Sequence, residues 1–145
     1  MKLELPAEKK LVHTMTMPIR WGDMDSVGHV NNALYFRYLE SGRIAWFDSI
    51  DATPASGGDE SFIIANVFCN FIHQLEYPGD IVVKTFISNI GRSSADTWHT
   101  IERTDRPGVI HATGGATVVW ISLAEHKSKP FPDWLRKKLE AAETA

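Results

Sequence analysis

A run of apolar side chains at helical spacing, between residues 31 and 49, constrains the fold of this chain more than any other feature. Residues three and four apart form one wide apolar face: Leu34, Tyr35, Tyr38, Leu39, Gly42, Ala45 and Trp46. A second apolar strip holds Phe36, Ile44 and Phe47. A helix that is apolar on most sides is usually buried on most sides. Because Gly42 is costly in a helix unless another backbone approaches closely, the pattern predicts a central helix, from about Asn31 or Asn32 to about Ser49, pressed onto a sheet.

The segments around this helix predict the strands of that sheet. Ahead of the helix, His13 to Arg20 mixes β-branched and apolar residues and predicts a first strand, with Pro18 favouring an edge or a strand end. After the helix, alternation with a period of two replaces the helical spacing. Four further strands are expected at Phe62 to Tyr77, Ile81 to Ile90, Thr97 to Arg103 and Val109 to Leu123.

Glycine and proline mark the connections between these segments. The predicted connections are a loop from Ile50 to Ser61, a turn at Pro78-Gly79-Asp80, a break from Gly91 to Ser94 and a hairpin loop from Thr104 to Gly108. Within the last strand, Gly114-Gly115 predicts a bulge or bend. Pro132 can begin a short final helix that runs through Leu139.

Strands joined by short turns favour an antiparallel sheet, so the order of elements predicts an α+β fold. The chain of 145 residues suits one domain and can bury a core without disulfides. One long helix cannot cover both faces of a five-stranded sheet, and an edge strand invites another copy of the chain. We therefore expect a homodimer or homotetramer.

The composition excludes several classes of protein. A net charge of −3 gives no basic field that would attract nucleic acid. No stretch is long and apolar enough to span a bilayer, and Met1 to Lys10 carries no apolar signal core. Cys69 is the single cysteine, so an intrachain disulfide is impossible and a reducing compartment fits. We expect a cytoplasmic protein with no nucleic-acid or membrane partner.

The polar segment from Trp21 to Asn32 puts a carboxylate, Asp25, just ahead of the predicted helix. A helix N-terminus has free backbone N–H groups and a partial positive charge. It can hydrogen-bond a carbonyl oxygen and stabilise the negative charge that develops there during attack. A carboxylate beside it can deprotonate a water molecule or attack directly. This arrangement suits a thioester, whose thiolate leaves without a strong general acid.

The segment from Arg20 to Arg43, with its Asp-x-Asp-x-x-Gly-His-Val-Asn-Asn sequence, resembles the signature of hotdog-fold thioesterases of the 4-hydroxybenzoyl-CoA type. It is also similar to plant acyl-ACP thioesterases, and a weaker similarity runs from Tyr77 to Ser94. The resemblance implies a hotdog fold, in which a five-stranded antiparallel sheet wraps around a long central helix and a short C-terminal helix follows. It implies one thioesterase domain over residues 1–145 that hydrolyses an acyl-CoA to a free acid and CoA, without a cofactor.

The same resemblance implies roles for particular residues. Asp25 would be the catalytic carboxylate, as general base or nucleophile, and the backbone N–H of Asn32 would polarise the thioester carbonyl. His29 falls where acyl-ACP thioesterases have a functional histidine, although Val27 stands where those enzymes have an asparagine. Four further residues are expected to contact the substrate: Tyr35, Arg92, Ser93 and Ser94. In the family the last three lie near the nucleotide end of CoA, where an arginine can pair with a phosphate.

Each of these residues also has a structural interpretation. Asp25 can cap the helix, and His29 can order the loop. Arg92 can be a solvated arginine at a bend. Glu40 and Arg43 lie three residues apart and can simply form a pair with each other, whereas a Glu40 that faces the sheet or a partner subunit can support the site.

Two other functions stay open, a hotdog dehydratase or hydratase and a non-catalytic acyl-CoA-binding protein. Other chemistries lack their motifs. The six histidines include no pair at i, i+4 and no Cys-His cluster, so no metal site is expected. The chain has no Gly-x-Ser-x-Gly elbow, no phosphate loop and no dinucleotide fingerprint.

Overall fold

The computed structural model of the chain describes residues 3–54 and 58–141. The helices and strands are β1 (Lys10–Pro18), α1 (Asn32–Ser49), β2 (Glu60–Phe71), β3 (Asp80–Ser88), β4 (Ser94–Arg103), β5 (Ile110–Ser122), β6 (Lys127–Ser128) and α2 (Asp133–Ala141). A single 3₁₀ turn, Trp21–Asp23, lies between β1 and α1. Within the described residues, no helix combines the length and the apolar character that crossing a membrane requires.

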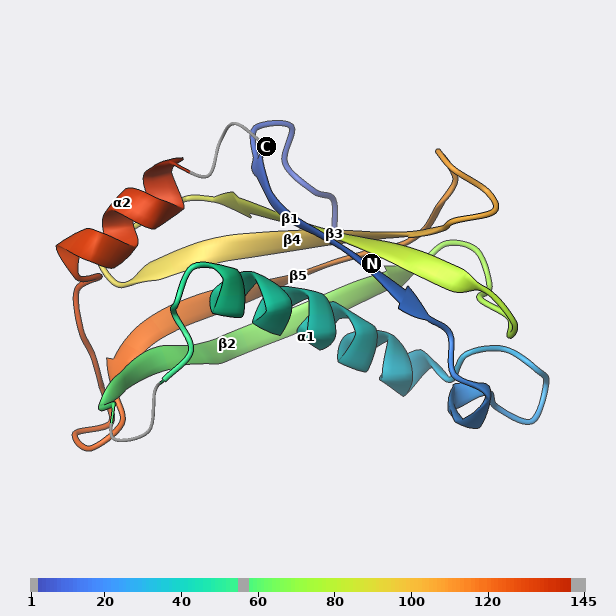
Figure 1. Cartoon of the computed structure of the whole chain (residues 1–145), viewed down its shortest axis with the longest axis horizontal. Helices are drawn as coiled ribbons and strands as arrows, with labels where there is room; N and C mark the ends of the chain where they lie inside the picture. Colours follow the sequence, from blue (N-terminus) through green and yellow to red (C-terminus); the bar gives the residue numbers. More distant parts are fainter. Residues whose placement is uncertain (1–2, 55–57, 142–145) are drawn as a thin grey trace.

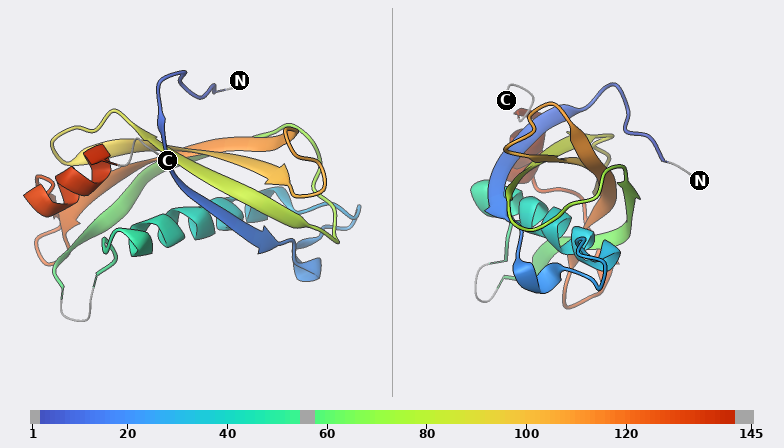
Figure 2. Two further views of the ribbon diagram at one scale, coloured as in Figure 1. Left: turned by 45° about the horizontal axis from the view of Figure 1, so that its top comes forward. Right: turned by 90° about the vertical axis from the view of Figure 1, so that its right-hand side faces the viewer.

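The strands form one antiparallel sheet in the order β1-β3-β4-β5-β2, and the two-residue β6 pairs with the end of β5. The sheet curves around α1, which lies along one face, while α2 covers one end (Figures 1 and 2). This is the hotdog arrangement, and the predicted α+β fold is confirmed. The sequence predicted five strands, and the short β6 is added to them.

Packing and capping both fix the position of α1. Tyr35, Tyr38 and Leu39 pack on strand residues near the N-terminus of the helix, and Trp46 and Phe47 pack on strands and α2 near its C-terminus. Burial of each such side chain contributes about 1.5–3 kcal/mol. After Ser49, the helix ends in a Schellman motif, in which the residue after the cap takes a left-handed conformation.

Gly42 is the point where α1 presses most closely on the sheet. A Cβ at this position would lie 2.7 Å from Cγ1 of Val83 on β3, closer than real carbon contacts allow. The predicted close approach at Gly42 is therefore confirmed, and the neighbour is a valine side chain rather than a backbone.

The glycine pair of β5 does not form the predicted bulge. Gly114 and Gly115 stand in regular register with both neighbouring strands, and the irregularities lie elsewhere. A Cβ at Gly114 would lie 2.6 Å from Leu39 Cδ1, and one at Gly115 would lie 2.6 Å from Phe68 Cε1. The two glycines therefore admit a helix residue on one face of the sheet and an aromatic ring on the other.

Several predicted boundaries were also wrong. β2 ends at Phe71 rather than Tyr77, because the N–H groups of Ile72 and His73 both turn to the carbonyl of His111. β4 begins at Ser94, three residues before the predicted start. Part of the predicted Ile50 to Ser61 loop is the start of β2, and its residues 55–57 lie outside the described residues.

β2 is an edge strand with apolar side chains in solvent. Ile63, Ile64, Val67 and Phe71 are each between 39% and 48% exposed in the single chain. An edge of this kind, with unpaired backbone groups beside apolar side chains, is suited to cover by another chain.

Candidate functional site

A small closed loop carries Asp25 between the 3₁₀ turn and α1. Met24 and Val30 form an isolated antiparallel bridge, and the Asp25 N–H donates to the His29 carbonyl over 2.7 Å. Gly28 closes the loop with a φ of 83°, a left-handed conformation that favours glycine. The loop therefore fixes the direction in which the Asp25 carboxylate points.

The Asp25 carboxylate is held by backbone N–H groups. Its Oδ1 accepts hydrogen bonds from Val27 N over 2.9 Å and from His29 N over 3.1 Å. These bonds, that from His29 first, lower the pKa of Asp25 below its ordinary value. Its Oδ2 has no hydrogen-bond partner in the part of the chain that the structure describes. The residue is thus an ionised carboxylate with one oxygen left for chemistry.

The N-terminus of α1 is capped in a way that spares one amide. The Asn31 side chain accepts from Ala33 N over 3.0 Å, and the Asn31 carbonyl accepts from Leu34 N. Among the described residues, no group accepts from the Asn32 N–H. This N–H is therefore available to a ligand oxygen at the positive end of the helix.

Asp23, the other carboxylate of the motif, anchors the loop to the helix. Its Oδ2 accepts from the Tyr38 hydroxyl over 2.8 Å and from Arg20 Nε over 3.0 Å. Its carbonyl accepts from Asn31 N. Burial raises the pKa of Tyr38 to about 12, so the phenol keeps its proton and donates it to Asp23. The Asp25 carboxylate is therefore held by backbone N–H groups of its own loop. The Asp23 carboxylate instead forms side-chain hydrogen bonds that fix the loop to α1.

An open hollow borders Asp25, and its other walls come from two segments. Trp21, Met24 and Ser26 belong to the same loop region, and Tyr77 reaches it from the turn before β3. Trp21 is 74% exposed and Tyr77 is 49% exposed in the single chain. Neither aromatic residue was predicted as a site residue, because neither carries a chemical motif of its own. The sequence signal that could have found them is an aromatic residue directly before a turn: Trp21 precedes Gly22, and Tyr77 precedes Pro78-Gly79.

His29 belongs to this loop and Tyr35 lies near it, but the polar side-chain atoms of both are bound elsewhere. The His29 imidazole Nε2 is 3.2 Å from Glu76 Oε1, and His29 bonds the Asp25 carboxylate through its backbone N–H. Tyr35 is buried, and its hydroxyl accepts from Leu75 N over 3.2 Å.

Arg92, Ser93 and Ser94 lie at the other end of the molecule. Their backbone bonds join the β3–β4 turn to the segments near α2, from Phe131 N to Arg92 O and from Trp120 N to Ser93 O. The N-terminus of α1 and this turn are at opposite ends of the helix (Figure 1), and an 18-residue helix is about 27 Å long. A single chain therefore does not bring these three residues to Asp25.

A groove runs between α1 and β2, which we call the α1–β2 groove. Its walls include Phe36, Leu39 and Phe47 from the helix side and Ile64 and Val67 from β2. Arg43 and Glu40 line it along its length, and both are shared by its two hollows. Most of its other lining residues are apolar, and Thr53 and Ser61 add hydroxyl groups to one of its hollows.

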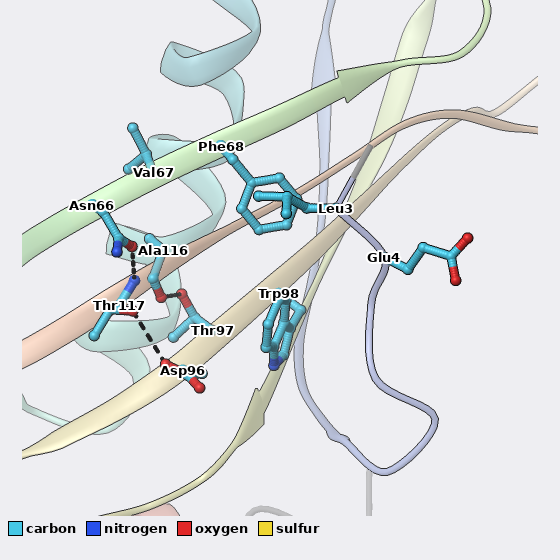
Figure 3. A pocket seen from close by; sticks show the side chains of 10 residues that line it. All are labelled: Leu3, Glu4, Asn66, Val67, Phe68, Asp96, Thr97, Trp98, Ala116 and Thr117. Carbon is cyan, nitrogen blue, oxygen red and sulfur yellow. Dashed lines mark hydrogen bonds between the residues drawn. The ribbon is translucent and has the colours of Figure 1, made fainter. Parts of the chain in front are cut away.

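A further pocket lies on the face of the sheet turned away from α1, under the N-terminal segment (Figure 3). Phe68 and Trp98 form its apolar part, with Leu3 over them. Its polar groups bond to one another: Thr117 Oγ1 donates to Asp96 Oδ1 over 3.1 Å, and Thr117 N donates to Asn66 Oδ1. The Asp96 carboxylate of this pocket is thus engaged, and Glu4, the other carboxylate that lines it, is exposed.

Over residues 3–54 and 58–141, no three His, Cys, Asp or Glu side chains are grouped closely enough to hold a metal ion. The chain matches the model of a protein family described as the thioesterase-like superfamily, over residues 19–139. The chain belongs to the thioesterase-like superfamily. That match includes the Asp25 loop, the whole of α1 and all of the long strands after it.

Solved structures of several other proteins are similar to this one. A Pseudomonas aeruginosa protein, provisionally named a thioesterase, has 36% identity over 88% of this chain and 98% of its own, with a TM-score of 0.81. A Xanthomonas campestris protein, provisionally named an acyl-CoA thioesterase, has 32% identity over 84% and 100% of the two chains, with a TM-score of 0.74. A Thermus thermophilus thioesterase, complexed with coenzyme A and Zn, has 26% identity over 93% and 96%, with a TM-score of 0.79.

Proposed function

We propose that this superfamily member hydrolyses acyl-CoA thioesters to a free carboxylic acid and CoA. The observation that carries the proposal is the pairing of an ionised Asp25 with the unengaged Asn32 N–H at the start of α1. Asp25 can activate or carry out the nucleophilic attack, and the Asn32 N–H can stabilise the oxyanion that results. The Thermus thermophilus structure, which holds coenzyme A on a similar fold, supports a CoA ester as substrate.

In the proposed reaction, the thioester carbonyl oxygen accepts from the Asn32 N–H. Asp25 then either removes a proton from water, which attacks the carbonyl carbon, or attacks that carbon itself. The carbon–sulfur bond breaks, and CoA leaves as a thiolate. In the water route the thiolate takes up the proton that Asp25 removed from water, and in the direct route it takes up a proton from solvent. In the direct route, water afterwards hydrolyses the acyl-Asp25 anhydride. In both routes Asp25 ends as a carboxylate.

His29 acts in this proposal as a positioning residue. Its amide holds Asp25 Oδ1, while its imidazole pairs with Glu76 and orders the loop against the segment before β3. Tyr35 supports the wall behind the loop through its buried ring, since its hydroxyl already accepts from Leu75 N.

We further propose that the active form is a homodimer or homotetramer, with CoA lying across two chains. Arg92, Ser93 and Ser94 are a helix length from Asp25 in one chain, so they can meet the same CoA only from a second chain. The exposed apolar edge of β2 is the surface on which such a partner would pair. The acyl group would then run from Asn32 into the α1–β2 groove.

One observation favours a second candidate. A histidine with an acidic partner is the pair that hotdog dehydratases use, and His29 with Glu76 is such a pair. A dehydratase would remove water from a 3-hydroxyacyl-CoA and release no thiol.

A panel of CoA esters offered to the wild-type protein separates these functions. Thiol release from saturated acyl-CoAs supports the proposal. Formation of an enoyl-CoA from a 3-hydroxyacyl-CoA, without thiol release, supports the dehydratase. Tight binding of esters with neither reaction would leave a non-catalytic acyl-CoA-binding protein and contradict the proposed hydrolysis.

A further inference from the structure

Arg43 is a buried cation without a carboxylate. It lies on α1 and is 5% exposed. Over the described residues, no Asp or Glu forms an ion pair with it, although a buried charge is normally paired. The expectation that Glu40 and Arg43 pair with each other is wrong, because Glu40 pairs with Arg37 on the exposed side of the helix over 3.5 Å.

The neighbour of Arg43 is a neutral histidine. Arg43 Nη1 is 3.3 Å from His99 Nε2, and His99 Nδ1 is 3.1 Å from Thr85 Oγ1. A guanidinium can only donate, so His99 Nε2 must accept and its proton sits on Nδ1. Burial and, to a smaller extent, the nearby guanidinium of Arg43 together lower the pKa of His99 to about 3. This neighbour therefore orients Arg43 without balancing its charge.

Arg43 also lines the α1–β2 groove. Both hollows of the groove are lined by Arg43 and by Glu40, and most of their other lining residues are apolar. The Glu40 carboxylate is held by Arg37 over 3.5 Å. Desolvation lowers the pKa of Arg43, which reflects the cost of a cation in these surroundings. An anion or an acceptor oxygen in the groove would offset that cost through a charge-assisted hydrogen bond, whereas a plain hydrocarbon chain would not.

The position of Arg43 along α1 relates it to the proposed reaction centre. From Asn32 to Arg43 is eleven residues, or about 16 Å along the helix axis. A medium or long acyl chain that begins at the Asn32 N–H and follows the groove would bring its far end to Arg43.

We propose that Arg43 is a specificity-determining residue that binds an acceptor oxygen, best a carboxylate, at the far end of the acyl group. The preferred substrates are then ω-carboxyacyl-CoA esters rather than simple fatty acyl-CoAs. This inference rests on the proposed thioesterase function for its reaction, and on Arg43 and the groove for its selectivity.

The test compares pairs of acyl-CoAs of equal chain length, one with a terminal methyl group and one with a terminal carboxylate. Wild type is expected to favour the carboxylate member in kcat/KM by about tenfold or more at the best length. Arg43→Met should abolish or reverse that ratio, and Arg43→Lys should keep part of it. Arg37→Met, on the exposed side of the same helix, is the matched control and should keep the wild-type ratio.

Two results would overturn the inference: no preference for the carboxylate in wild type at any length, or an unchanged ratio in Arg43→Met. If Arg43→Met does not fold, the inference is still tested by the carboxylate-to-methyl ratio of kcat/KM in wild type and in Arg43→Lys. A second readout needs no turnover. Calorimetry should detect binding of a free dicarboxylic acid to wild type, and weaker binding of the monocarboxylic acid of equal length. Binding of the dicarboxylic acid without hydrolysis of any ester would support the Arg43 site and contradict the thioesterase function. Hydrolysis of esters without a preference for the terminal carboxylate would support the thioesterase function and contradict the Arg43 site.

Discussion

The backbone N–H of His29 donates to Oδ1 of Asp25 over 3.1 Å, while the His29 imidazole lies 3.2 Å from Glu76. The histidine therefore reaches the carboxylate through its amide and not through its ring. This relationship separates two accounts of the site, since an amide survives replacement of the side chain and a catalytic ring does not.

His29→Ala is accordingly expected to lower kcat for a CoA ester by less than about tenfold, below the 10²–10⁴ that a general acid or base supplies. The hydrogen bond from the backbone N–H of residue 29 to Asp25 persists, and the contact between the imidazole and Glu76 is lost. Steady-state kinetics checks this. A loss of several orders of magnitude would instead place the His29 ring in the chemistry of hydrolysis and contradict its role as a positioning residue.

The pH dependence of hydrolysis should follow the depressed pKa of Asp25. Amide hydrogen bonds, first that of His29, hold this pKa below the ordinary 3.8. A carboxylate with a lowered pKa contributes stability above the unfolded-state pKa, and this is lost as the pH falls through the folded-state pKa. The ionised, reactive form of Asp25 is likewise present above this pKa and is lost below it. We therefore expect kcat/KM to show no acid limb until the pH falls below 3.8. An acid limb near neutral pH would mean that another group is essential.

Gly28→Ala tests whether loop geometry supports catalysis. The left-handed conformation at Gly28 costs an alanine about 1–2 kcal/mol, although nothing lies within 4 Å of its added Cβ. We expect lower stability and a lower kcat, because the strained loop no longer holds Asp25. Gly108→Ala is the matched control, with the same φ of +83° and the same open space in the β4–β5 hairpin. It should lose similar stability in urea and retain kcat, and equal kinetic effects in both variants would contradict the account.

Val67→Lys tests the proposed partner surface on β2. Val67 is 48% exposed in the single chain, so lysine there is harmless to an isolated protomer and disruptive under a second chain. Sedimentation should show an oligomer for wild type and a smaller species for the variant. Leu123→Lys, at a residue 41% exposed beyond the end of β5, should leave the oligomer intact. A monomeric wild type would contradict the two-chain site.

The sequence predicted the elements whose signals are local. The apolar face of α1 follows from spacing and residue type, and so does the place of Asp25 ahead of the helix, although the cap is Asn31 and not Asp25. Features that depend on two distant segments were missed or misread. Gly114 looked like a bulge, because only the fold brings Leu39 against it.

Contacts between distant segments also explain two wrong predictions, the end of β2 and the pairing of Glu40 with Arg43. The alternating pattern of β2 continues past Phe71, yet the His111 carbonyl takes the next amides out of the ladder. Arg43 lies three residues from Glu40 in the sequence, and spacing alone cannot tell that one side chain is buried against His99 and the other faces solvent.

The most direct test of the central claim is thiol release from acyl-CoA by Asp25→Asn, with Asp23→Asn beside it. Asp25→Asn removes the reactive carboxylate and should lower kcat by two orders of magnitude or more, in the range of general-base and nucleophile losses, about 10²–10⁴. Asp23→Asn weakens the bonds to Tyr38 and Arg20, so it should lower the thermal midpoint more than it lowers kcat. A folded Asp25→Asn protein that hydrolyses CoA esters at the wild-type rate would contradict the assignment of Asp25.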